Sequence, residues 1–171
     1  FKGYRMILFP MFDWSSVLSM LKSIRKYRPV SMPAVPSLWA SLLEHPQAVE
    51  YGIASIEITT AGGAPVPLWL QEKYFELTGQ RLSQAYGLSE ASSSTHITPF
   101  GAGGNSTSIG VPLPDTDVRI VDIETGETEC PAGAVGEMIV RGPQVMQGYW
   151  NDPERTAESL RGGWLHTRDL A

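Results

Sequence analysis

Two short runs of the sequence each contain several side chains that are suited to binding a nucleotide. The first, residues 84–90, contains the aromatic ring of Tyr86 and ends on a hydroxyl followed by the carboxylate of Glu90. The second, residues 163–169, ends on the carboxylate of Asp169. An aromatic face can stack on a base, a carboxylate suits a phosphate-bound cation, and a carboxylate can also accept hydrogen bonds from ribose. These residue types predict that the two runs bind a nucleotide.

Further stretches accompany the two runs in sequence. The small residues Gly62-Gly63-Ala64-Pro65 lie upstream, and residues 136–150 lie between the runs. Small residues allow a backbone to approach a ligand closely. Each run by itself is also compatible with an ordinary capped turn, but the order and separation of the whole set favour nucleotide binding.

The first 105 residues have the pattern of an α/β layer. Apolar runs alternate with segments of helical periodicity, which predicts a parallel sheet with flanking helices. The predicted strands are Arg5–Pro10, Val30–Val35, Ser55–Thr60 and Arg81–Tyr86. The predicted helices follow Asp13 or Ser15 as a cap, begin at Pro36, and run from about Pro67 to Thr78. Because ligands of such sheets bind at the carboxyl ends of the strands, residues 62–65 and 86–90 should lie side by side there.

Residues 106–171 have a different character. Short alternating stretches predict a small, β-rich, barrel-like subdomain after a flexible loop at 101–106. The predicted strands are Asp117–Asp122, Val135–Arg141 and Trp164–Thr167, with a turn at Glu124–Glu127 and a short helix capped by Asp152. We expect His166 on the surface of its strand. The domain boundary is thus predicted between residues 105 and 106.

Composition excludes several function classes. The net charge of −5 argues against a nucleic-acid partner, and no apolar run approaches the roughly 20 residues of a membrane span. The single Cys130 cannot form an internal disulfide, so we expect a reducing compartment, the cytoplasm. Four basic residues in the first helix form a solvated face or, as the alternative, a peripheral contact with anionic lipid. The chain starts at Phe1 without methionine, and we expect a piece of a longer protein.

Together these stretches resemble the adenylate-forming superfamily of acyl- and aryl-CoA ligases, luciferases and peptide-synthetase adenylation domains. The likeness covers essentially the whole chain and is strongest to bacterial long-chain fatty-acid–CoA ligases. The stretches that carry it are Gly62–Pro65, Gln84–Glu90, Ser108–Asp115, Gly136–Met146, Gly148–Trp150 and Gly163–Asp169.

The resemblance implies a role for each matching residue. Tyr86 would lie against adenine, Asp169 would bind the ribose hydroxyls, Ser89 would approach the α-phosphate, and Glu90 would hold Mg²⁺. The resemblance names Ser89 and Glu90 as catalytic residues and Glu90 as the metal ligand. The implied nucleotide-binding residues are Gly62, Gly63, Ala64, Pro65, Gln84, Ala85, Tyr86, Gly87, Leu88, Ser89 and Asp169.

The implied reaction joins a carboxylic acid, expected to be a fatty acid, to ATP as an acyl-AMP and then to CoA. ATP, Mg²⁺ and CoA as co-substrate are the cofactors that this reaction needs. The family's phosphate loop and its lysine-bearing domain are not among these 171 residues, so the isolated segment is expected to be inactive. The sequence does not determine the acyl chain length or the oligomeric state.

Three alternatives stay open beside a CoA ligase. An acyl-AMP ligase could load a carrier protein instead of CoA, a luciferase-like oxidation shares the same motifs, and a homologue that binds nucleotide or a partner could lack catalysis. Gln84 and Leu88 argue against a peptide-synthetase adenylation domain. The chain departs from the family at Arg168, where glycine is usual; we expect an extended backbone there, with the arginine facing away from Asp169.

Overall fold

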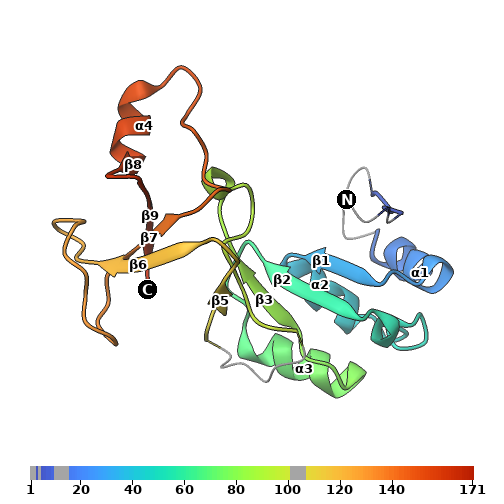
Figure 1. The fold of residues 1–171 in the computed structure, drawn as a ribbon. Helices are drawn as coiled ribbons and strands as arrows, with labels where there is room; N and C mark the ends of the chain where they lie inside the picture. The colour runs from blue at the N-terminus through green and yellow to red at the C-terminus, as the bar shows by residue number, and fades with distance from the viewer. Residues whose placement is uncertain (1–2, 4, 10–15, 101–106) are drawn as a thin grey trace.

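The computed structural model describes residues 3, 5–9, 16–100 and 107–171, which form two β-sheets and four α-helices (Figure 1). The first sheet has the strand order β1-β2-β3-β4-β5, and the second has the order β6-β7-β9-β8. The strands of the first sheet are β1 (Ser31–Ala34), β2 (Ile58–Gly62), β3 (Ser83–Tyr86), β4 (His96–Ile97) and β5 (Val111–Pro112). Those of the second are β6 (Asp117–Val121), β7 (Glu137–Arg141), β8 (Leu160–Arg161) and β9 (Trp164–Leu170).

The first sheet is parallel where helices connect its strands. β1 pairs with β2 and β2 with β3, both in parallel, which confirms the predicted α/β layer. β4 and β5 pair antiparallel at its edge, which the sequence did not predict. Only the short segment 87–95 separates β3 from β4, and a parallel crossover needs a dozen or more residues. The chain therefore turns back on itself instead of crossing over.

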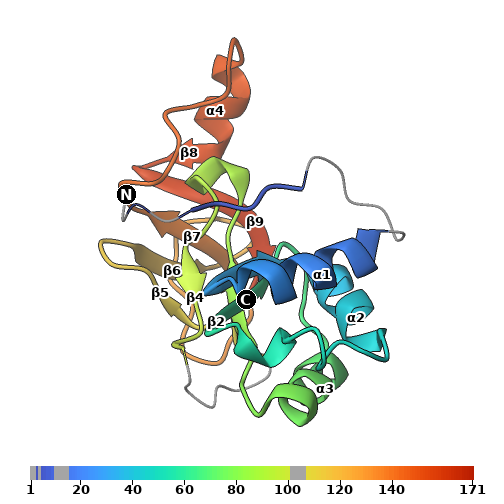
Figure 2. The same ribbon diagram turned by 90° about the vertical axis from the view of Figure 1, so that its right-hand side faces the viewer.

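Helices α1 (Val17–Tyr27), α2 (Pro36–Glu44) and α3 (Leu68–Thr78) build the main core with the first sheet. Trp39 and Tyr74 are fully buried and meet edge to face, with ring centroids 5.4 Å apart. The indole nitrogen of Trp39 donates a hydrogen bond to the carbonyl of Thr60, 2.9 Å away, which ties α2 to β2. Pro36 opens α2 as predicted, and Gly79 ends α3 with a φ of +70°. In Figure 2 the three helices gather at the opposite end of the molecule from α4.

The strand predicted at Arg5–Pro10 is wrong over its described part. Residues 5–9 have no regular structure, and the side chains of Met6 and Leu8 are 77% and 76% exposed. A strand needs hydrogen bonds from a neighbour, and no described strand pairs with these residues. An apolar composition alone is therefore not sufficient to form a strand here. The cap predicted at Asp13 or Ser15 and the loop at 101–106 lie outside the described residues.

The second sheet is antiparallel throughout and confirms a small β-rich unit. Val121, Ile139 and Trp164 form its core, and Asp152 caps α4 (Pro153–Ser159) by accepting a hydrogen bond from the Arg155 amide. The boundary between residues 105 and 106 stays a prediction, and β5 beyond it belongs to the first sheet. None of the helices described here has the length and hydropathy to cross a membrane.

Candidate functional site

The small residues after β2 and the first run after β3 lie at the same edge of the first sheet. Gly62 is the register partner of Ala85, so the two segments that follow leave the sheet side by side, as predicted. A Cβ atom on Gly62 would lie 2.5 Å from the carbonyl oxygen of Ala85. Any side chain at position 62 would therefore push the two strands apart. Gly63 has a φ of +80°, a conformation that favours glycine, and Ala64 and Pro65 are exposed beside it.

The two predicted runs meet through Tyr86 and Asp169. The phenol of Tyr86 donates a hydrogen bond of 2.5 Å to Oδ2 of Asp169, although the residues are 83 positions apart. The Tyr86 ring also meets His96 edge to face, with ring centroids 5.8 Å apart. Partial burial, followed by the hydrogen bond to Asp169, raises the pKa of the Tyr86 phenol. Tyr86 therefore stays a neutral donor that orients the Asp169 carboxylate.

Glu90 lies in a short 3₁₀ turn, Ser89–Ala91, just beyond the end of β3. Its Oε1 accepts a hydrogen bond from the phenol of Tyr149 at 2.8 Å, and its carbonyl accepts one from the Met146 amide at 2.7 Å. Ser89 is exposed on the same turn. The hydroxyl and the carboxylate thus stand near the edge where Tyr86 and Asp169 meet.

The residues present fit a magnesium ion that is shared with a substrate. The described residues contain no group of three or more side chains that could enclose a metal. Mg²⁺ is usually bound through one or two carboxylates together with substrate phosphates and water. A carboxylate has about four acceptor sites, so the bond from Tyr149 leaves Glu90 capacity for a cation.

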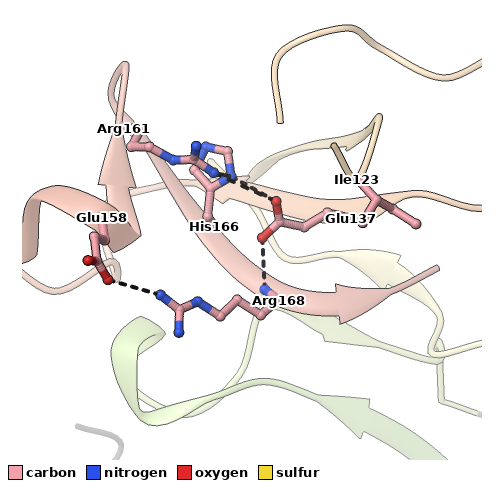
Figure 3. A pocket seen from close by; sticks show the side chains of 6 residues that line it. All are labelled: Ile123, Glu137, Glu158, Arg161, His166 and Arg168. Carbon is pink, nitrogen blue, oxygen red and sulfur yellow. Dashed lines mark hydrogen bonds and ion pairs between the residues drawn. The ribbon is translucent and has the colours of Figure 1, made fainter. Parts of the chain in front are cut away.

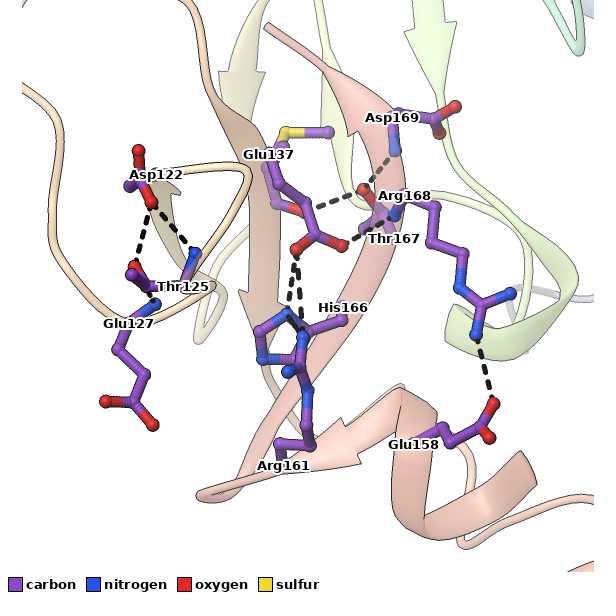
Figure 4. A network of polar contacts seen from close by, with 11 residues as sticks. Asp122, Thr125, Glu127, Glu137, Glu158, Arg161, His166, Thr167, Arg168 and Asp169 are labelled. Atoms are coloured by element: carbon purple, nitrogen blue, oxygen red, sulfur yellow. Dashed lines mark hydrogen bonds and ion pairs between the residues drawn. The ribbon is translucent and has the colours of Figure 1, made fainter. Parts of the chain in front are cut away.

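The expected extended backbone at Arg168 is wrong. Its φ is +63°, in the left-handed region, where the register of β7 and β9 shifts between Glu137 and Ile139. The Arg168 amide turns there to donate a 3.0 Å hydrogen bond to Oε1 of Glu137. The side chain still points away from Asp169, as expected, and its guanidinium lies 3.4 Å from Glu158 (Figure 4).

A polar cluster beneath this bulge was missed by the sequence analysis. Nδ1 of His166 lies 2.9 Å from Oε2 of Glu137 and 2.7 Å from the guanidinium of Arg161 (Figure 3). His166 is only 7% exposed, so its prediction as a surface residue is wrong. Strand alternation was the available signal, because residues 164 and 166 share one face and Trp164 is a core residue.

The cluster lines an open pocket of about 400 Å³ together with Ile123, Glu158 and Arg168. Burial acts to raise the pKa of the Glu137 carboxyl, but hydrogen bonds from His166 and from the Arg168 amide outweigh it. The pKa of Glu137 consequently lies below its ordinary value. A charged Glu137 therefore holds together β7, β9 and the bulge that places Asp169.

Comparisons with known proteins agree with this geometry. The model of a family described as AMP-binding enzyme matches residues 1–150. A long-chain-fatty-acid–CoA ligase of Bacillus subtilis (strain 168) is 45% identical over 168 residues, which are 98% of this chain and 29% of that protein. The chain thus spans less than a third of this relative's length.

Solved structures give the same fold. The amide bond synthetase McbA from Marinactinospora thermotolerans matches with a TM-score of 0.83 and 35% identity, over 95% of this chain and 32% of that one. An anthranilate CoA ligase in complex with anthranoyl-AMP matches with a TM-score of 0.88, over 98% of this chain and 32% of that one. At 23% identity the second match supports the fold alone.

Proposed function

This chain belongs to the family of AMP-binding enzymes, and we propose that the protein it forms part of is an ATP-dependent acyl-CoA ligase. Its substrate class would be carboxylic acids, with fatty acids first. The observation that carries the proposal is the hydrogen bond from Tyr86 to Asp169. It joins an aromatic ring and a carboxylate beside the close backbone approach of Gly62 and Ala85.

In the proposed complex each group at this edge contacts one part of ATP. The Tyr86 ring lies against adenine, and the Asp169 carboxylate accepts hydrogen bonds from the ribose hydroxyls. Residues 62–65, with Gln84, Ala85, Gly87 and Leu88 on the neighbouring segment, form the wall of the pocket. Tyr86 donates to one carboxylate oxygen of Asp169, and a carboxylate can accept further donors.

The proposed reaction has two steps. An oxygen of the acid attacks the α-phosphorus of ATP, which forms acyl-AMP and releases pyrophosphate. The sulfur of CoA then attacks the acyl carbonyl, and AMP leaves. Ser89 would stand beside the α-phosphate and Glu90 would bind Mg²⁺, which supplies neutralisation of phosphate charge. We also propose a cytoplasmic location.

A second candidate differs only in the acceptor of the acyl group. A relative that is 35% identical is named an amide bond synthetase, and an amide bond is a different product from the thioester that CoA gives. An acyl carrier protein would be the alternative acceptor. The proposed activation step with ATP is the same for either acceptor, and parallel assays with CoA and with an acyl carrier protein distinguish the two candidates.

Pyrophosphate exchange with ATP tests the activation step in the full-length protein. We expect exchange that depends on a fatty acid, and then thioester formation when CoA is added. Asp169→Asn is the matched variant, since it keeps the shape and removes the charge. Hydrogen bonds to a charged group contribute about 1.5–3 kcal/mol, so apparent ATP affinity should fall about 10- to 100-fold. Full-length protein that binds ATP but shows no exchange with any acid would instead support a non-catalytic homologue.

Arg168→Gly should leave ATP affinity nearly unchanged. The arginine contacts Glu158 rather than Asp169, and the side chains of Arg168 and Glu158 are both more than 60% exposed. Loss of this ion pair lowers the free energy of unfolding by about 0.2–1 kcal/mol. Glycine adopts the left-handed backbone without strain, which raises the free energy of unfolding by about 1 kcal/mol. Calorimetric titration with ATP and a thermal melt measure both effects. A large tightening of ATP binding would mean that Arg168 obstructs the site.

A further inference from the structure

Glu90 is hydrogen-bonded to a segment more than fifty residues later in the chain. Its side chain accepts from the Tyr149 phenol at 2.8 Å, and its backbone carbonyl accepts from the Met146 amide at 2.7 Å. Ser92, at the end of the same turn, donates a 2.9 Å hydrogen bond to the carbonyl of Gln144. The turn that carries Glu90 is therefore tied along one side to residues 144–149.

Tyr149 is itself held by the N-terminal turn of α4. Its amide donates to the hydroxyl of Thr156 at 2.9 Å, and that hydroxyl donates to the Asp152 carbonyl at 2.7 Å. The guanidinium of Arg155 lies 5.3 Å from the centre of the Tyr149 ring, within the range of a cation–π contact. Both the backbone and the ring of Tyr149 therefore contact residues of α4.

We propose that Tyr149 is a positioning residue for Glu90. By donating to one carboxylate oxygen, the phenol fixes the orientation of the group and leaves acceptor capacity for the cation that accompanies ATP. A neutral phenol can do this without cancelling the carboxylate charge, whereas lysine or arginine would compete with the cation. The proposal rests on the proposed function, in which Glu90 binds Mg²⁺.

A magnesium titration of ATP–pyrophosphate exchange tests this role in the full-length protein. Loss of a residue that orients a metal ligand typically costs 10- to 100-fold in metal affinity or activity. For Tyr149→Phe we expect the half-saturating Mg²⁺ concentration to rise about 10-fold. Tyr27→Phe is the matched control, because it makes the same change on a tyrosine that is 45% exposed at the end of α1, and it should titrate like the wild type.

Calorimetry supplies a readout that does not depend on turnover. Mg²⁺ should tighten ATP binding less in Tyr149→Phe than in the wild type, while ATP affinity without Mg²⁺ stays the same. If Tyr149 acts through Glu90, the double variant with Glu90→Gln should bind and react no worse than Glu90→Gln alone.

The outcomes separate the two proposals. A wild-type protein that exchanges pyrophosphate in response to Mg²⁺, together with an unchanged titration in Tyr149→Phe, would overturn the role of Tyr149 alone. A lower melting temperature with unchanged Mg²⁺ dependence would do the same, because it marks a purely structural tie. A wild-type protein without Mg²⁺-dependent exchange would overturn the proposed function, and the role of Tyr149 with it.

Discussion

Replacing Glu90 with glutamine in the full-length protein is expected to slow ATP–pyrophosphate exchange by about 10²–10³-fold, the typical cost of one lost charge contact in a transition state. Glutamine has nearly the same shape, and its amide oxygen can still accept the bond from Tyr149. The fold should therefore be preserved. In the proposed reaction, the missing negative charge would weaken binding of the cation that neutralises the phosphates as the acid attacks.

The control for this variant is Glu76→Gln on α3, an exposed glutamate to which we assign no role. It makes the same chemical change and should leave exchange unaltered. Circular dichroism of both variants should match the wild type. If Glu90→Gln exchanged pyrophosphate at the wild-type rate, Glu90 would be a residue of an ordinary capped turn and another group would hold the cation.

The meeting of the two strand ends could be predicted from sequence because local rules determine it. Helical periodicity between apolar runs predicts parallel pairing, and parallel strands carry their following loops to one edge. Residues 62–65 and 86–90 follow neighbouring strands and therefore meet, as the register of Gly62 with Ala85 confirms. No knowledge of side-chain packing was needed for this step.

The antiparallel edge could not be predicted in the same way. β4 and β5 contain two residues each, too few for a period to be recognised in sequence. The strand predicted at Arg5–Pro10 was wrong for the opposite reason. The apolar pattern of residues 5–9 resembles a strand, but no described strand hydrogen-bonds to them. Pairing partners, rather than composition, decide both cases.

Contacts between distant segments were the main part of the site that sequence could not supply. The bond from Tyr149 to Glu90 spans 59 positions, and the bond from Tyr86 to Asp169 spans 83. Glu137 and His166 likewise meet only because β7 pairs with β9. At Arg168, an extended backbone was the natural expectation for arginine, and the bulge that overrides it is stabilised by the bond from its amide to Glu137.

Gly87→Ala should give the largest loss of stability among the variants considered. A Cβ atom at this position would lie 1.6 Å from the carbonyl oxygen of Ser93 and 2.6 Å from the Cα of Ser94. Both contacts are to backbone, so no side-chain rotation can relieve them. The loop cannot open easily, because the Thr95 amide is bound to the Tyr86 carbonyl at 2.9 Å. Overpacking of this kind costs about 3 kcal/mol of unfolding free energy.

Urea unfolding of the full-length protein, followed by circular dichroism, measures that loss, and Gly162→Ala provides the control. Gly162 has a φ of +57° and open space around its Cα, so alanine there incurs only backbone strain, about 1 kcal/mol. Gly87 has no positive φ, so its variant lacks this strain, and the steric contact costs at least the difference between the two variants. The folded fraction of Gly87→Ala should also bind ATP more weakly, since the turn with Ser89 and Glu90 must shift. Equal stability of the two variants would mean that the loop at residues 87–95 can open to admit a side chain, and that close backbone packing does not fix the position of Glu90.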